Sequence, residues 1–181
     1  MISLSMAQPL EASIRNRLGE LHQELDNSLK VSYVKGETPL MPPRKVEEIL
    51  KDMEKVETDL RRLRVARDLA NHQAVVAWKI EGYDKLSIAE ALELAKQFRE
   101  RLNLYRQMAR ENPNVHSVVN FRSFGSGSDM LARVTYDPAF YQHQAKKLER
   151  QVNALSIAID KANQTVQLEF DASPYLEGLE S

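Results

Sequence analysis

The sequence contains no cysteine, which excludes disulfides, thiolate metal sites and a thiol nucleophile. Aromatic residues make up only 7% of the 181 residues, and tryptophan occurs once. This composition favours helices packed through Leu, Ile, Val and Ala over a β-sandwich or barrel. The longest uninterrupted apolar run, residues 74–78, is far shorter than the roughly 20 residues that a membrane-spanning helix needs. We therefore expect a soluble protein.

The two signs of charge are nearly balanced. Lys and Arg total 25 and Asp and Glu total 26, which gives a net charge of −1 at pH 7. This balance supplies no global field that would hold nucleic acid or an anionic membrane, so we expect neither as a partner. The first residues lack the basic and apolar regions of a secretory signal peptide. A cytoplasmic location is the expectation that follows.

Glycine and proline are few, and apart from Gly19 they fall between long periodic segments. Such spacing predicts long helices separated by short connections. The predicted helices span residues 9–31, 44–71, 87–111 and 138–163. Ser87 to Glu90 forms a capping-box pattern and Asp137-Pro138 an N-cap followed by proline, which predict the starts of the last two helices.

The segment 46–63 shows the pattern most clearly. Its apolar residues recur at alternating steps of three and four, the heptad seam of a helix that packs along a neighbour. They are Val46, Ile49, Met53, Val56, Leu60 and Leu63. Comparable stripes run through the other helices, and the nearest partner of this one is expected to be helix 9–31. We predict a mainly α, single-domain fold of four long helices in coiled-coil-like antiparallel packing.

A minor β component is expected where the helical period stops. Alternating apolar residues and glycines predict β-hairpins at 74–86 and 115–136 and a closing strand at 165–170. The remaining tail, 172–181, is expected to be frayed. These short elements would lie at the ends of the helices.

Motifs that carry chemistry are scarce. None of the four histidines has a glutamate three residues before it, as helical di-metal sites require. No Gly-x-Ser-x-Gly elbow is present, and the glycines at 125 and 127 lack the ending of a phosphate-binding loop. We expect no metal and no cofactor, and we favour a non-enzymatic role while leaving enzymatic activity open.

One polar group breaks the apolar pattern at the end of helix 44–71. Arg67 falls on the seam, where a charge must find a partner or reach water, and Asp68 and Asn71 follow it. Asn163 occupies the comparable junction after the last helix. If both junctions lie together, Arg67, Asp68, Asn71 and Asn163 would form a ligand-binding pocket. The alternative is that these side chains cap helix ends and satisfy strand backbones.

Several segments appear in the order found in a known family. They are Val34–Pro39, Arg67–Asn71, Leu86–Leu92, Ser128–Met130 and Leu155–Asn163. On these segments the sequence resembles the septicolysin-like family of bacterial proteins. Asp68 stands where that family tends to have Asn, and Gln164 where it tends to have Trp. The resemblance implies the family's fold and, through its name, a cytolytic activity. Charged residues in both predicted hairpins argue against a lipid-facing segment.

Four hypotheses about function remain. The first is a non-enzymatic homo-oligomer whose helical seams mediate self-assembly or the binding of a protein partner. The second is a small-ligand site or a weak enzymatic site at the helix–strand junctions. Membrane damage, implied only by the family name, is the third, and a prefoldin-like holdase, on architectural analogy alone, is the fourth.

Overall fold

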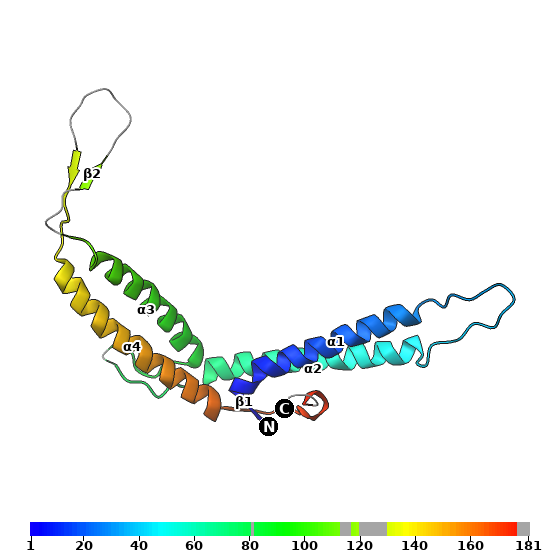
Figure 1. Cartoon of the computed structure of the whole chain (residues 1–181). Helices are drawn as coiled ribbons and strands as arrows, with labels where there is room; N and C mark the ends of the chain where they lie inside the picture. Colours follow the sequence, from blue (N-terminus) through cyan, green and yellow to red (C-terminus); the bar gives the residue numbers. More distant parts are fainter. Residues whose placement is uncertain (81, 113–116, 120–129, 177–181) are drawn as a thin grey trace. The chain divides into compact units, whose positions relative to one another are not determined.

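The computed structural model describes residues 1–80, 82–112, 117–119 and 130–176. Four helices dominate it, with a minor β component (Figure 1), which confirms the predicted fold class. Its contacts gather in two compact units, Met1–Val75 with Asp160–Ser181, and Val76–Ile159. The expectation that the chain folds as a single domain stays a prediction.

Helices α1 (Ala7–Ser28) and α2 (Val46–Gln73) form the body of the first unit. They lie antiparallel and side by side (Figure 1), which confirms helix one as the neighbour of the 46–63 seam. Ile49, Met53, Val56 and Leu63 are buried on α2, against Leu10, Ile14 and Leu21 on α1. Both helices begin and end within two or three residues of the predicted bounds, since helix ends are the least regular part of a periodic segment.

The two ends of the described chain meet in this unit through a short antiparallel sheet. Strand β1 (Ile2–Ser3) pairs with β4 (Gln167–Leu168), with Ile2 opposite Leu168. A 3-10 turn, η1 (Leu4–Met6), follows β1, and the Leu4 amide donates to the carbonyl of Val166 at 2.8 Å. The predicted strand 165–170 is thus present but shorter. Its partner at the start of the chain was not predicted.

The expectation of a frayed tail is wrong for residues 172–176. A 3-10 turn, η2 (Ser173–Tyr175), buries Ala172 and Tyr175. The Tyr175 hydroxyl donates to Asp59 Oδ2 on α2 at 2.7 Å. Burial raises the pKa of Tyr175 well above its ordinary value, and the hydrogen bond to Asp59 adds to the rise. One aromatic anchor therefore holds this segment, while residues 177–181 lie outside the described part of the chain.

The second unit contains α3 (Ile88–Met108) and most of α4 (Pro138–Thr165). Their seams are buried, through Ala91, Ala95, Phe98 and Leu102 on α3 and Ala145, Leu148, Val152 and Leu155 on α4. The caps are as predicted. Ser87 and Glu90 exchange both hydrogen bonds of a capping box, and Asp137 Oδ1 accepts from the Ala139 amide at 2.9 Å.

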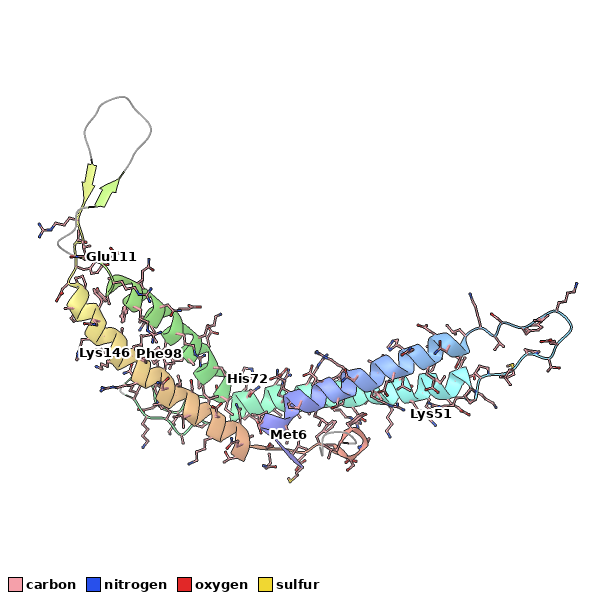
Figure 2. All side chains as sticks on the ribbon, in the orientation of Figure 1. Met6, Lys51, His72, Phe98, Glu111 and Lys146 are labelled. Carbon is pink, nitrogen blue, oxygen red and sulfur yellow. The ribbon has the colours of Figure 1, made fainter. Side chains whose placement is uncertain are left out.

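The segment 74–86 differs from the predicted hairpin. It turns at Gly82, where φ is +88°, but its described residues form isolated bridges in place of regular strands. Ile80 lies opposite Tyr83, Val75 and Ser87 are also bridge residues, and the Val76 amide donates to the Leu86 carbonyl at 2.9 Å. The reason is packing, because Trp78 and Tyr83 are drawn against Phe98 of α3, with ring centroids 6.4 and 5.9 Å from that ring. Phe98 is labelled on α3 in Figure 2.

The second hairpin, predicted at 115–136, is present in part. Strand β2 (Ser117–Val119) pairs antiparallel with β3 (Met130–Ala132), with Val118 opposite Leu131. The segments 113–116 and 120–129, which include the glycines at 125 and 127, lie outside the described residues. Among the helices described, none is long and apolar enough to cross a membrane.

Candidate functional site

The charge that breaks the seam of α2 has a partner on α1. Arg67 Nη1 donates to Glu11 Oε2 at 2.6 Å, and Arg67 Nε donates to Asp68 Oδ1 at 3.0 Å. Arg67 therefore lies between two carboxylates, one on the facing helix and one on its own. The requirement that a seam charge find a partner is met by Glu11.

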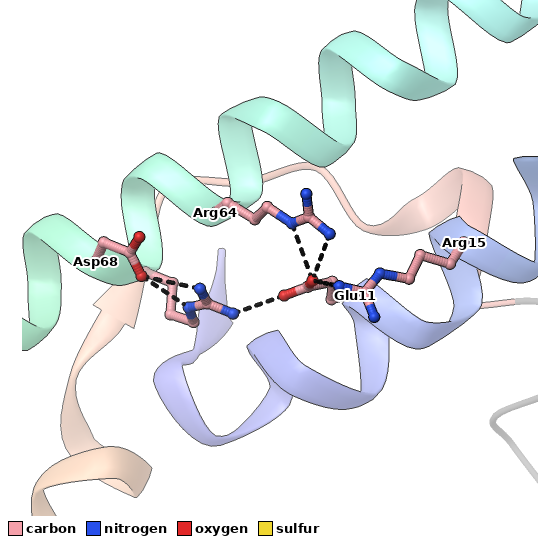
Figure 3. Close-up of polar contacts among 5 residues, drawn as sticks. Glu11, Arg15, Arg64 and Asp68 are labelled. Carbon is pink, nitrogen blue, oxygen red and sulfur yellow. Dashed lines mark hydrogen bonds and ion pairs between the residues drawn. The ribbon is translucent and has the colours of Figure 1, made fainter. Parts of the chain in front are cut away.

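Glu11 is the centre of a larger network, the Glu11 cluster, made of Glu11, Arg15, Arg64, Arg67 and Asp68 (Figure 3). Arg64 Nε and Nη2 both lie 2.9 Å from Glu11 Oε1. Arg15 Nη2 donates to the same oxygen at 2.6 Å, from one turn farther along α1. Three guanidinium groups thus meet the carboxylate of Glu11. With Asp68 as the second carboxylate, the cluster has three positive and two negative charges, a net charge of +1.

Local sequence explains how the cluster forms. Glu11 follows Leu10 of the α1 seam, so its side chain starts beside the helix interface and is only 7% exposed. Arg64 and Arg67 are three residues apart on α2 and share a face, while Arg15 is four residues from Glu11. Antiparallel packing brings the start of α1 to the end of α2, and the charges meet there.

Burial and charge act in opposite directions on Glu11. Burial raises the pKa of its carboxyl. The hydrogen bond and charge of Arg64, together with the charges of Arg15 and Arg67, lower that pKa by more than burial raises it. The pKa of Glu11 therefore lies below its ordinary value, and the group is ionised at neutral pH. A buried carboxylate with three charge-assisted partners is an electrostatic link between α1 and α2.

The structure brings only some of the predicted site residues together. Arg67 and Asp68 are in contact. Within the described part of the chain, no side-chain hydrogen bond joins Asn71 or Asn163 to either of them. The pocket predicted from these four residues stays a prediction. Arg67, the arginine of this predicted pocket, is paired with the carboxylates of Glu11 and Asp68.

Glu11 was missed by sequence reasoning, although a signal existed. It is the only acidic residue among the first nineteen. An antiparallel pairing of helix 9–31 with helix 44–71 requires the start of the first helix to lie beside the end of the second. Combined with the need of Arg67 for a counter-charge, that geometry would have selected Glu11.

The described residues contain no group of three or more His, Asp or Glu side chains placed to hold a metal ion. The polar chemistry of the cluster is therefore that of guanidinium groups and carboxylates. It can cross-link helices and attract an anion, and its groups are already paired with one another.

Comparison with known proteins identifies the family. A family described as "Family of unknown function (DUF6847)" matches residues 11–168, which is most of the chain and includes the Glu11 cluster. The chain belongs to the DUF6847 family. This match corrects the resemblance drawn from the sequence. The septicolysin-like assignment is wrong, because the family that matches residues 11–168 is DUF6847.

Other comparisons add little to this DUF6847 assignment. A crystal structure of a functionally unknown conserved protein from Corynebacterium diphtheriae is similar over 93% of this chain and 99% of that chain, with 20% identity and a TM-score of 0.49. No curated protein matches the sequence. The cytolytic activity implied by the mistaken resemblance has no further basis.

Proposed function

We propose that this DUF6847 protein is a non-enzymatic helical protein that self-associates through exposed apolar faces of its helices. The observation that carries the proposal is a pair on α2, Val65 and Leu69. They are four residues apart and therefore share a face, and both are exposed, by 62% and 53%. Further exposed apolar side chains lie on the other helices, namely Leu92, Leu104, Phe140 and Ile157.

Neighbouring apolar residues on one helical face are the usual starting point of helix–helix association. The seam of α2 that faces α1 is already filled by Ile49, Met53, Val56 and Leu63. The Val65 and Leu69 side chains are therefore additional to the intramolecular seam. A second chain that offers a similar face would remove them from water.

The proposal predicts that the purified protein is larger than one chain. Size-exclusion chromatography with light scattering at micromolar concentration should give a multiple of 20.7 kDa. Val65→Lys combined with Leu69→Lys should reduce that mass, because the new lysines of one chain would be buried against those of the other. Leu50→Lys, on the same helix, is the matched control. A single species of 20.7 kDa for the unmodified protein would contradict the proposal.

Binding of a small anion at the Glu11 cluster is the second candidate. It rests on the positive charge in excess and on the partial exposure of Arg15 and Arg64, whose side chains are 59% and 41% exposed. A guanidinium can bind carboxylate or phosphate through two parallel hydrogen bonds. Such a ligand would add to the pairs already present.

This candidate predicts that anions raise the melting temperature. Inorganic phosphate and citrate should stabilise the protein in a thermal-shift assay, because a ligand that binds only the folded state shifts the folding equilibrium. The shift should disappear in Arg64→Ala and persist in Arg17→Ala, whose arginine pairs with Glu20 outside the cluster. Equal responses to these anions and to chloride at the same ionic strength would exclude a specific site.

A further inference from the structure

The connection between α1 and α2 is unusually long for two antiparallel helices. It spans residues 29–45, all described, and contains neither helix nor strand. Helix–helix connections in bundles are commonly about 2–8 residues, and irregular loops longer than about 12–15 residues are uncommon and are usually either functional or linkers. Figure 1 shows this loop, the 29–45 loop, extending well beyond the ends of both helices.

Among the described residues of its unit, apart from the first, the 29–45 loop carries the most exposed apolar side chains. Leu40 is 89% exposed and Met41 71% exposed. Tyr33, Val34 and Leu29 are also exposed, and side chains of the loop project away from the chain in Figure 2. Exposed apolar residues gathered on one protruding segment, unlike residues scattered singly, mark an interaction site.

The charge of the 29–45 loop differs from that of the whole chain. It holds four basic residues, Lys30, Lys35, Arg44 and Lys45, against one acid, Glu37. Arg44 is engaged by Glu24 at 3.0 Å and by Asp52. Among the described residues, no ion pair involves any of the three lysines. The nearest further acids in sequence, Glu47 and Glu48, lie in the first turn of α2.

We propose that the 29–45 loop binds the surface of an anionic lipid bilayer, with Leu40 and Met41 in the interface and the lysines at the headgroups. A convex apolar tip flanked by lysines suits a bilayer, which needs no matching pocket and combines burial of apolar groups with attraction to anionic lipids. The loop's prolines limit its freedom in solution. The overall charge of −1 does not oppose this, because screening confines the attraction to charges within about 10 Å of the surface.

Flotation with lipid vesicles tests the proposal on the full chain. The protein should float with vesicles of equimolar phosphatidylcholine and phosphatidylglycerol, and much less with pure phosphatidylcholine. Lys35→Gln with Lys45→Gln should lower the partition coefficient about 30-fold, at roughly fivefold for each lysine. Leu40→Ser with Met41→Ser should lower it about tenfold or more. Leu104→Ser with Ile157→Ser, two exposed apolar residues on helices, is the control and should not change it.

A labelled variant locates the contact, and the absence of native cysteine makes this straightforward. An environment-sensitive dye on Leu40→Cys should shift to the blue when anionic vesicles are added, and the same dye on Leu104→Cys should not. Equal binding to neutral and anionic vesicles would overturn the proposal, as would binding that the loop variants leave unchanged. Absence of vesicle binding, with an oligomer that dissociates in Leu40→Ser with Met41→Ser, would assign the loop to a protein contact instead.

Discussion

Phe98→Ala is expected to lower the free energy of unfolding by about 3–5 kcal/mol, the range for loss of a buried aromatic ring. Phe98 is 4% exposed and packs edge-on against Trp78 and Tyr83. Its removal would leave a cavity among these rings that α3 and the 74–86 segment cannot readily close. Urea unfolding followed by the fluorescence of Trp78, the only tryptophan, measures the effect directly.

Leu92→Ala is the matched control for Phe98→Ala. Leu92 lies on the same helix but is 48% exposed, so its replacement should change the free energy of unfolding by about 0.5 kcal/mol or less. The emission spectrum of Trp78 should change in Phe98→Ala and not in Leu92→Ala. If the two variants were equally stable, the aromatic group would not be a core of this unit.

Glu11→Ala is expected to have the second large effect, a loss of about 2–4 kcal/mol in the free energy of unfolding. The substitution leaves three guanidinium groups close together without their shared carboxylate. The loss stays below the upper limit for a buried pair because the arginines are partly exposed and can recover some hydration. Far-UV circular dichroism follows it, and Glu20→Ala, whose pair with Arg17 is exposed, should cost about 1 kcal/mol or less.

The lowered pKa of Glu11 also predicts how stability depends on pH. The unfolded chain, in which the carboxyl titrates near pH 4.3, binds the proton more tightly than the folded chain. The stabilisation is therefore complete above that pH and is lost as the pH falls through the lowered pKa of the folded state. Glu11→Gln should consequently lose less stability than the unmodified protein upon acidification. If both proteins lost the same free energy of unfolding on acidification, the assignment of this pH dependence to Glu11 would be contradicted.

The same measurements test the single-domain prediction. Trp78 reports on the Val76–Ile159 unit, whereas Glu11 lies in the other unit. If the chain unfolds as one domain, Glu11→Ala should shift the Trp78 transition as much as the circular dichroism transition, because two-state unfolding gives coincident probes. Separate midpoints would show that the units unfold independently.

The sequence by itself determined most of the helical framework. Heptad spacing located four helices, and the caps at Ser87 and Asp137 placed two of their starts. These features depend on residues within a turn or two of one another, so a single sequence suffices to recognise them. It also identified Arg67 as a charge in need of a partner. Its short segment resemblances pointed to a different family from the one that matches residues 11–168.

Only the tertiary structure decided which distant residues meet. Glu11 joins Arg67 across 56 positions, and Tyr175 joins Asp59 across 116. Ile2 and Ser3 supply the strand that pairs with β4. Local periodicity carries no information about such partners, because each contact depends on how whole helices are placed. The predicted hairpin at 74–86 is present only in part, with isolated bridges in place of regular strands. Trp78 of this segment packs against Phe98, a contact that local strand preference does not predict.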